Sequence, residues 1–407
     1  MQGHPVLPYY PGSVCARIVK YNQVQHFYFD HNATTPVAPE VLETLVACLG
    51  QTYGNASSIH HFGQGAKQKL EAARRQVAAL IHASPTEIVF TSGGTEANNL
   101  AILGTARAAQ QARRHIITCA IEHPAVLAPA KQLGSEGVEV TCLRVPENGI
   151  VNSEDVRRAM RPDTVLVSIM HANNELGTIQ PIAEIAQIAH QTGALLHVDG
   201  VQALGKIPVD VQALGADLYT ISGHKIYAPK GVGALYARKG VRFAPVAYGG
   251  HHERDRRPGT ENVPGIAAFG AAAELAARRM SEDSERLGML RDRLESAVLD
   301  RIAGSGVNGS RWNRVPNTSN IYFDGIDGEA MVIALDLRGF AVSTGAACSS
   351  GALSPSHVLK AIGLSDDRAR ASMRFSLGRD NTMEQVDGLV EAITASVAHL
   401  RRISVHA

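Results

Sequence analysis

The stretch Ser222-Gly-His-Lys225, running into Pro229-Lys-Gly-Val-Gly-Ala-Leu-Tyr236, places one lysine where an apolar run stops. The amine of such a lysine can form a Schiff base with a carbonyl compound. Taken alone, Lys225 is more often an ordinary solvated lysine that follows a strand. Its meaning therefore depends on the groups that the rest of the sequence supplies.

An acidic residue upstream completes the pattern. The apolar run Ala194-Leu-Leu-His197-Val198 ends in Asp199, and Gln202 follows shortly after it. A carboxylate at the C-terminal end of a parallel strand lies where α/β folds bind ligands. Pyridoxal phosphate requires a lysine for the imine and an acid that keeps its pyridine nitrogen protonated. Asp199 alone is equally compatible with a helix cap, but the pair predicts a pyridoxal-phosphate site.

A phosphate site is indicated by Thr91-Ser-Gly-Gly94-Thr95-Glu96, between a strand-like run at 87–90 and a helix-like run at 97–103. Glycines such as Gly94 let backbone amides approach a phosphate, and a helix N-terminus adds the positive end of its dipole. The hydroxyl of Thr95 adds a further donor. An ordinary capped turn has the same sequence pattern. This stretch therefore indicates a phosphate site only in combination with Lys225 and Asp199.

The apolar runs at 116–118, 164–170 and 195–198 alternate with helical patterns such as 182–190. This alternation predicts an α/β fold with a large, mostly parallel sheet covered on both faces. A charged helical pattern at about 271–302 then leads to a smaller α/β domain whose core includes 321–323 and 331–335. We predict an N-terminal extension over 1–27, a large domain over 28–270 and a small domain over 271–407.

The composition fits a globular protein with two cores. The chain has 407 residues, of which 45% are hydrophobic and 19% charged, and its net charge of +1 favours neither nucleic acid nor an anionic membrane as partner. No segment approaches the roughly twenty apolar residues of a membrane span, and residues 1–27 lack the apolar core of a secretory signal. Five cysteines, an odd and sparse set, favour a reducing compartment. We therefore expect a cytoplasmic protein.

Seventeen histidines raise the question of a metal, especially at His251-His-Glu253 and His60-His61. Adjacent residues rarely face one ion together, and neither His-Glu-x-x-His nor paired Cys-x-x-Cys spacing occurs. We expect no structural metal.

The chain resembles a cysteine desulfurase of the NifS/IscS type, within the class V aminotransferase family of fold-type I pyridoxal-phosphate enzymes, from about Tyr28 to about Arg401. Nine strings carry this resemblance in order: Tyr28-Phe-Asp-His-Asn-Ala-Thr-Thr-Pro36, Thr91-Ser-Gly-Gly-Thr-Glu96, Ile121-Glu-His-Pro124, His171-Ala-Asn-Asn-Glu-Leu-Gly177, His197-Val-Asp-Gly-Val-Gln202, Ser222-Gly-His-Lys225, Arg257-Pro-Gly-Thr-Glu-Asn262, Ser343-Thr-Gly-Ala-Ala-Cys-Ser-Ser350 and Arg374-Phe-Ser-Leu-Gly-Arg379.

The resemblance implies a role for each matching residue that meets the cofactor ring. Lys225 would form the imine and shuttle the substrate α-proton. Asp199 would pair with the pyridinium nitrogen, and Gln202 would donate to the phenolic oxygen. His123 would stack on the ring face and offer an acid–base group.

The remaining implied roles concern the phosphate and the substrate. Thr95, Ser222 and His224 would hold the phosphate. In this family a threonine of the partner subunit completes that site, and Thr260 is the match, so a homodimer is implied. Asn174 and Arg374 would grip the substrate carboxylate, a bidentate task that suits arginine.

Cys348 decides which class V reaction the resemblance implies, because desulfuration needs a nucleophile for sulfur. It lies in a run of small residues, 343–355, that is suited to carrying a thiolate into a site and a persulfide out of it. A cysteine among alanines is also typical of a buried structural position, and we expect that position for Cys15, Cys48, Cys119 and Cys142.

The implied reaction converts L-cysteine to L-alanine and leaves a persulfide on Cys348. A thiol or an acceptor protein, such as an iron-sulfur scaffold, would then take the sulfur. Two alternatives stay open. A selenocysteine lyase or another class V aminotransferase would use Lys225, Asp199 and His123 without the same need for Cys348, and a sulfur carrier would need Cys348 but neither Lys225 nor Asp199. Compared with housekeeping desulfurases, the sequence after Leu400 is short and lacks the long tail that helps those relatives dock the scaffold.

Overall fold

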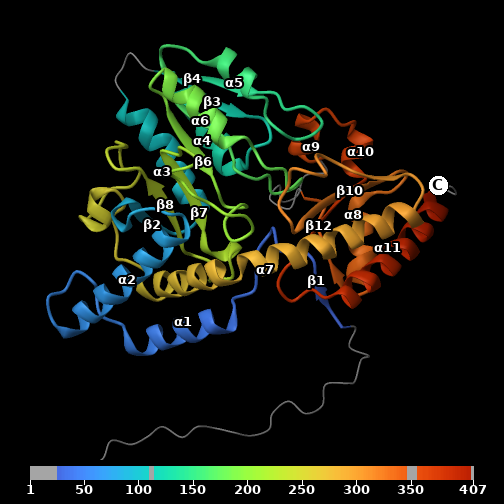
Figure 1. The fold of residues 1–407 in the computed structure, drawn as a ribbon, viewed down its shortest axis with the longest axis horizontal. Coiled ribbons are helices and arrows are strands. Elements are labelled where there is room, and N and C mark those ends of the chain that lie inside the picture. Colours follow the sequence, from blue (N-terminus) through green and yellow to red (C-terminus); the bar gives the residue numbers. More distant parts are fainter. Residues whose placement is uncertain (1–24, 110–113, 346–354, 405–407) are drawn as a thin grey trace, which may run out of the picture.

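A seven-stranded sheet forms the centre of the larger part of the molecule (Figure 1) in the computed structural model, which describes residues 25–109, 114–345 and 355–404. The strand order is β2-β8-β7-β6-β5-β3-β4, and within this sheet only β8 runs antiparallel to its neighbours. The strands are β2 Ile88–Thr91, β3 His115–Cys119, β4 Glu139–Leu143, β5 Thr164–Ser168, β6 Leu195–Asp199, β7 Leu218–Ser222 and β8 Gly233–Ala237. The predicted large, mostly parallel sheet is confirmed.

Helices cover both faces of this sheet, because successive side chains of a strand point to opposite faces. Leu166 and Leu218 pack with α3 (Gly94–Ala108) and α4 (Pro124–Ser135). Their neighbours Val167 and Tyr219 pack with α2 (His61–Leu80), α6 (Ile182–Gln191) and the long helix α7 (Val263–Arg301). Both faces are therefore apolar, which explains the nearly continuous hydrophobic runs in the strand sequences.

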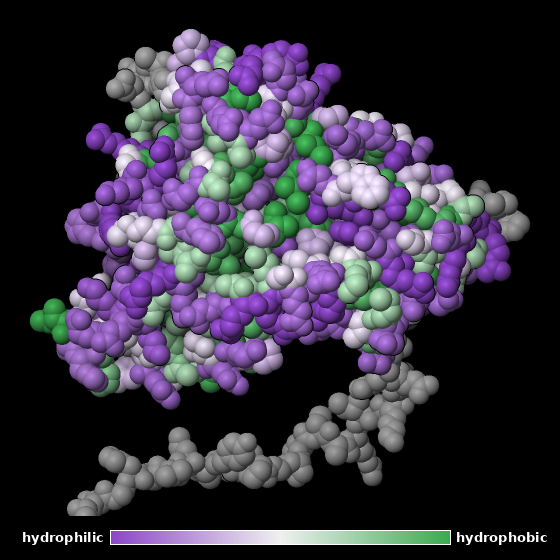
Figure 2. Space-filling model, viewed as in Figure 1, coloured by the Kyte–Doolittle hydropathy of each residue, from purple (hydrophilic) through white to green (hydrophobic). Residues whose placement is uncertain are grey.

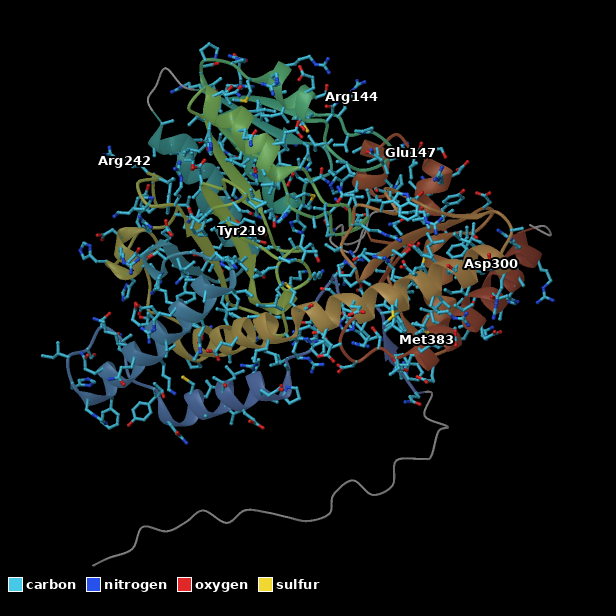
Figure 3. All side chains as sticks on the ribbon, in the orientation of Figure 1. Arg144, Glu147, Tyr219, Arg242, Asp300 and Met383 are labelled. Atoms are coloured by element: carbon cyan, nitrogen blue, oxygen red, sulfur yellow. The ribbon has the colours of Figure 1, made fainter. Side chains whose placement is uncertain are left out.

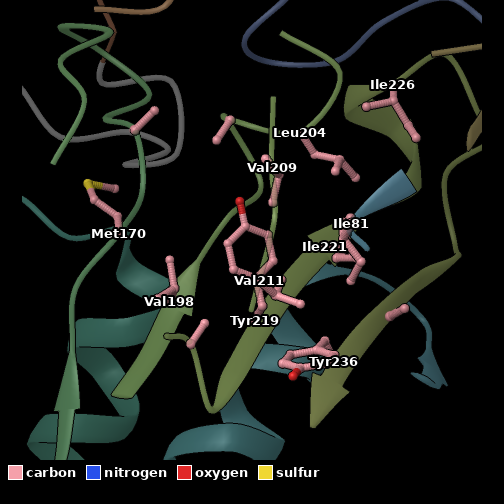
Figure 4. Packing of buried hydrophobic residues seen from close by; sticks show 14 of the residues in the cluster. Ile81, Met170, Val198, Leu204, Val209, Val211, Tyr219, Ile221, Ile226 and Tyr236 are labelled. Atoms are coloured by element: carbon pink, nitrogen blue, oxygen red, sulfur yellow. The ribbon is translucent and has the colours of Figure 1, made fainter. Parts of the chain in front are cut away.

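Tyr219 stands in the middle of the second face, between Val198 and Val211, and Figure 4 shows its ring among these aliphatic side chains. The ring lies so close to Gly200 that a Cβ there would be 1.9 Å from it. Glycine is thus required directly after Asp199, and the chain can turn sharply where β6 ends.

The smaller part contains a three-stranded antiparallel sheet of β12 (Ser372–Ser376), β10 (Thr318–Phe323) and β9 (Ser305–Val307), and β1 (Phe27–Tyr28) pairs with β11 (Phe340–Ala341). Its own core includes Phe29, Leu294, Ile321, Phe323 and Met331. The remaining helices are α1 Pro39–Gln51, α5 Ser153–Ala159, α8 Gly328–Asp336, α9 His357–Ala361, α10 Asp366–Arg370 and α11 Met383–Ser404, with 3-10 turns η1 Pro85–Glu87, η2 Gly223–Lys225 and η3 His252–Asp255.

Helix α7 joins the two parts: it packs on α1 and α2 at one end and on β10 and α11 at the other (Figure 1). Polar side chains such as those of Arg144, Arg242 and Asp300 lie at the periphery of the molecule, whereas Tyr219 lies inside (Figure 3). The helix predicted at about 271–302 begins earlier, at Val263. The domain boundary at 270 falls inside α7 and stays a prediction.

The expected burial of the other cysteines is correct for Cys48 and Cys119 and wrong for Cys142. Cys142 is exposed because β4 is an edge strand of the large sheet. Cys15 lies outside the described residues. Within the part of the chain that the structure describes, no helix is both long and apolar enough to cross a membrane, and no cluster of metal-ligating side chains occurs.

Candidate active site

A cavity of about 370 Å³ opens where the large sheet meets the smaller part of the molecule. Strands β6 and β7 end at it in Asp199 and Ser222, which is the edge where α/β folds bind ligands. Among the predicted site residues, the following line the cavity: Gly94, Thr95, His123, Asn174, Asp199, Gln202, Ser222, His224, Lys225 and Arg374. Side chains distant in sequence therefore meet in one chamber.

Two predicted residues are not among those that line it. Thr260 is exposed on the loop between η3 and α7. Cys348 lies outside the described residues. Gly345, three positions before Cys348, does line the cavity.

Lys225 ends the short turn η2, directly after β7. Its Nζ donates to the carbonyl oxygens of Asn32 and Ala33, the latter at 2.7 Å. Both acceptors belong to the loop that follows β1. The amine is therefore held at the cavity wall by backbone oxygens from a distant segment.

A second lysine lies beside the first. Lys206 Nζ donates to Gln202 Oε1 at 2.6 Å and to Asn32 Oδ1 at 2.8 Å. Burial lowers the pKa of Lys206 well below its usual range, and the charges of Lys225 and Arg374 lower it further. Because Lys206 takes the Gln202 oxygen, the amide orientation is fixed, with Nε2 donating to Asn32 O at 2.9 Å. Nε2 carries two N–H donors, and the second is the one that a phenolic oxygen would need.

The Asp199 carboxylate is anchored at both oxygens. Asn98 Nδ2 of α3 donates to Oδ2 at 2.7 Å, and the Val201 amide donates to Oδ1 at 3.1 Å. Both carboxylate oxygens of Asp199 are thus fixed in direction, and the residue lines the cavity.

The predicted phosphate cup is formed by the first turn of α3, which begins at Gly94 and whose Gly94 and Thr95 line the cavity. A Cβ on Gly94 would lie 2.9 Å from Val201 Cγ2, so only glycine lets the helix start this close to the loop after β6. Burial and the nearby Lys225 and Lys230 charges lower the pKa of His224 to about 4. Its Nδ1 lies 3.1 Å from Thr34 Oγ1. His224 therefore acts as a neutral hydrogen-bonding group.

His123 caps α4, and its Nδ1 accepts from the Ala125 amide at 3.0 Å. Since Nδ1 accepts, the neutral ring carries its proton on Nε2. Burial lowers the pKa of His123, with the Asp199 carboxylate opposing this and Lys225 adding to it. The preceding Glu122 is fully buried, and burial raises its pKa to about 8, although hydrogen bonds from Cys119 and the Met170 amide oppose the rise and Asp199 adds to it.

Arg374 enters from β12 and is 3% exposed. It forms an ion pair with Asp30 at 2.6 Å and donates to the Asn174 carbonyl at 3.1 Å. Its buried Nε has no hydrogen-bond partner among the described residues. The guanidinium thus keeps a donor suited to a carboxylate beside Asn174.

Sequence reasoning gave no role to Asn32, Asn98 or Lys206. Asn32 lies in a quoted motif and Asn98 one turn beyond the phosphate cup, so their position beside predicted site residues was an available signal. Lys206 lies four residues after Gln202, one helical turn away, which was an equally direct signal.

Comparisons with known proteins agree with this geometry. The sequence matches the aminotransferase class-V family over residues 27–389. Cysteine desulfurase IscS of Dictyoglomus turgidum is 48% identical over 377 residues, which cover 93% of this chain and 96% of that protein. The solved structure of a NifS-like protein matches with a TM-score of 0.87 at 38% identity, covering 92% of this chain and 100% of that one. The structure of SspA in complex with cysteine matches with a TM-score of 0.78 at 36% identity, covering 86% and 98%.

The chain therefore belongs to the aminotransferase class-V family, and within that family to the cysteine desulfurases of the NifS/IscS type. Its architecture is the fold-type I architecture of the NifS-like structures, as predicted.

Proposed function

We propose that this protein is a cysteine desulfurase that uses pyridoxal phosphate to convert L-cysteine to L-alanine, leaving the sulfur as a persulfide on Cys348. The observation that carries this proposal is the single cavity in which Lys225, Asp199 and Arg374 meet. An amine, a buried carboxylate and a guanidinium are the three groups that the cofactor aldehyde, the cofactor ring nitrogen and an amino-acid carboxylate require.

The residues present fit the cofactor. The Gly94 cradle at the start of α3 would be filled by any Cβ, and it faces the same chamber as the anchored Asp199 carboxylate. In the proposed complex Thr95, Ser222 and His224 would hold the phosphate, Gln202 and His123 would contact the ring, and Lys225 would bind the cofactor aldehyde. When bound, the cofactor supplies an electron sink for charge at the substrate α-carbon.

Substrate binding falls to Arg374 and Asn174. Both residues line the cavity, and the Nε of Arg374, which has no hydrogen-bond partner among the described residues, is a donor suited to a carboxylate at this end of it. The amine of Lys225, held by two backbone carbonyls, is the group that removes and returns the α-proton. We propose His123, whose Nδ1 accepts from the Ala125 amide and whose neutral ring therefore carries its proton on Nε2, as a second proton donor.

In the proposed reaction Cys348 accepts the sulfur atom. Its sulfur forms a bond to the substrate sulfur as the carbon–sulfur bond breaks, so a thiol and L-cysteine become a persulfide and L-alanine. Gly345 lines the cavity, and three residues span at most roughly 11 Å. The tether therefore supports delivery of the thiolate into the chamber. A selenocysteine lyase or another class V aminotransferase is the alternative, and neither needs this thiol in the same way.

A homodimer is part of the proposal. Leu42, Val46 and Leu49 form an exposed apolar stripe on α1, with the i, i+4, i+7 spacing of one helix face, and they are 48%, 59% and 61% exposed. Apolar clusters exposed in this way mark interaction surfaces. Thr260, exposed and away from its own cavity, is the residue proposed to complete the partner's phosphate site.

An iron-sulfur scaffold is the proposed sulfur acceptor. The sparse cysteines favour the cytoplasm as the compartment of the protein.

The test compares sulfide and alanine release from L-cysteine, with a thiol reductant, in wild type and Cys348→Ala. We expect equal amounts of both products from wild type, and loss of turnover in the variant with its visible cofactor absorbance retained. Cys142→Ala, which removes an exposed thiol elsewhere, should keep full activity. If Cys348→Ala is as active as wild type, the persulfide reaction is wrong and another class V reaction applies.

A further inference from the structure

Glu175 is a buried carboxylate without a role in the proposed chemistry. It follows Asn174 and is 2% exposed. Asn173 fixes the loop, because its Oδ1 accepts from the amides of Glu175 and Leu176, both at 2.8 Å. The carboxylate is thus held at a defined point beside the cavity, where burial raises its pKa and hydrogen bonding to Ser356 and the Arg374 charge oppose that rise.

One end of segment 346–354 meets this carboxylate through Ser356. Ser356 Oγ donates to Glu175 Oε2 at 2.6 Å and also accepts from the Leu359 amide as the N-cap of α9. The next residue is fixed as well, since His357 Nε2 lies 2.9 Å from the Glu122 carbonyl. Helix α9 therefore starts at a position set by the large sheet's loops.

The other end of the segment meets the same carboxylate oxygen. Gly345 has a φ of +92°, and a Cβ there would lie 2.8 Å from Glu175 Oε2. Its amide donates to Ser343 Oγ at 3.0 Å, and the residue lines the substrate cavity. Glycine is required here both by the backbone conformation and by the close approach of the carboxylate.

We propose that Glu175 is a positioning residue for sulfur transfer: its carboxylate accepts a hydrogen bond from Ser356 at one flank of the segment that carries Cys348 and packs against Gly345, which lines the cavity, at the other. The inference rests on the proposed function and adds a residue to it. Fixing both ends of a short segment reduces the conformations from which its thiolate must reach the substrate, and positioning of this kind raises the rate of the chemical step. Glu175 itself touches neither substrate nor cofactor in this account.

The first test is Ser356→Ala, which removes the donor to Glu175. We expect persulfide formation on Cys348 in a single turnover to slow roughly tenfold, the effect of losing one charge-assisted hydrogen bond. The KM for L-cysteine and the visible absorbance of the bound cofactor should not change, since Arg374 and Lys225 are untouched.

Ser319→Ala is the matched control. Ser319 is also buried, and its Oγ donates to a buried glutamate, Glu295, at the same 2.6 Å, but in the smaller part of the molecule. This variant should lose a similar hydrogen bond and keep the wild-type single-turnover rate. If Ser356→Ala and Ser319→Ala react at the same rate, the positioning role is wrong.

A second pair keeps the inference testable if Ser356→Ala does not fold. Gly345→Ala places a methyl group against Glu175 Oε2, whereas Gly363→Ala has nearly the same backbone strain, with φ +91°, and no atom within 4 Å. We expect only Gly345→Ala to slow persulfide formation. Equal rates overturn the inference, while full turnover by Cys348→Ala overturns the proposed function instead.

Discussion

At the scale of single residues, Asn32 connects the groups that surround Lys225. Its backbone carbonyl accepts from Lys225 and Gln202, and its side-chain oxygen accepts from Lys206 and Asn317. Its side-chain nitrogen Nδ2 donates to the Asn174 carbonyl. One buried residue therefore forms hydrogen bonds with residues of both the large and the smaller part. These bonds fix the positions of the cavity-wall side chains before any ligand binds. Preorganised polar groups of this kind need little rearrangement during reaction.

Asn98→Ala should weaken the site without changing its shape. The variant removes the 2.7 Å hydrogen bond to Asp199, and such bonds to charged groups are worth about 1.5–3 kcal/mol. We therefore expect kcat with L-cysteine to fall at least about tenfold. Steady-state kinetics measure this.

The neighbouring amide provides the control. Asn99 Nδ2 donates to the Thr95 carbonyl of its own helix, at 2.9 Å. Asn99→Ala should stay within about 0.5 kcal/mol of wild type in stability and keep its turnover. Equal losses in both variants would contradict an anchoring role for Asn98.

Lys225, Asp199 and Gly94 could be found from the sequence pattern because each follows an apolar run or opens a helix, which is where α/β folds place ligands. The roles of residues such as Asn174 and Arg374 came from the family resemblance instead. Lys206 and Asn98 could not be assigned in the same way. Their positions near predicted site residues were a signal, but their roles depend on tertiary contacts with Asn32 and Asp199, residues far from them in sequence, and local pattern does not predict such pairs.

At the scale of elements, the start of α3 is where the proposed cofactor binding should be most sensitive to a small substitution. Gly94→Ala would bring a methyl group to 2.9 Å from Val201 Cγ2 and push the first turn away from the cavity. We expect the affinity for pyridoxal phosphate to fall at least about tenfold, or about 1.4 kcal/mol. Titration of cofactor-depleted protein, followed by visible absorbance, measures this.

Gly65→Ala is the control for that substitution, since a Cβ at this position in α2 meets nothing within 4 Å. It should raise helix stability by up to about 1 kcal/mol and leave cofactor affinity unchanged. Unaltered affinity in Gly94→Ala would show that the phosphate binds elsewhere.

Helix α7 shows why an element boundary was misplaced. The sequence contains start signals at Asn262 and Pro264, and the Asn262 side chain caps the helix by accepting from Gly265. The charged pattern predicted a start only at about 271, after Gly270. In the structure Gly270 serves packing instead, because a Cβ there would lie 2.8 Å from Ala73 Cβ of α2.

At the scale of the whole molecule, buried histidines predict acid sensitivity. Burial lowers the pKa of His197 to about 3 and that of His171 to about 4, whereas an unfolded histidine titrates near about 6.5. The folded state therefore binds fewer protons in this window. The stability that these neutral histidines contribute is therefore fully present above pH ~6.5. Below that pH the free energy of unfolding falls by about 1.4 kcal/mol per pH unit for each histidine.

Urea unfolding across this pH window measures the slope. His197→Gln keeps hydrogen-bonding capacity toward Ser168 and Thr220 and should make the slope shallower by one histidine's share. His399→Gln, at an exposed position on α11, should leave the slope as in wild type. A wild-type slope in His197→Gln would contradict the assignment.

The apolar stripe on α1 predicts the assembly state. Val46→Asp places a charge in the middle of the stripe and should convert a dimer to a monomer, as measured by light scattering after size-exclusion chromatography. Leu337→Asp alters another exposed apolar residue, 75% exposed after α8, and should remain dimeric. A dimeric Val46→Asp would place the subunit interface elsewhere.

The surface in Figure 2 is mostly hydrophilic, with apolar areas interspersed. The α/β fold, its parallel sheet and the cavity edge were predictable because apolar periodicity and strand-end polarity are local signals. The packing of the two parts around a shared cavity was not predictable from such local signals. It depends on contacts between segments that are distant in sequence, such as 27–32 and 372–376.

The most direct test of the central claim is mass spectrometry of the peptide that contains Cys348, after the holoenzyme has reacted with one equivalent of L-cysteine without reductant. We predict that this peptide gains one sulfur atom, that an equal amount of L-alanine appears, and that added dithiothreitol releases the sulfur as sulfide. Formation of alanine with an unmodified Cys348 peptide would contradict the account.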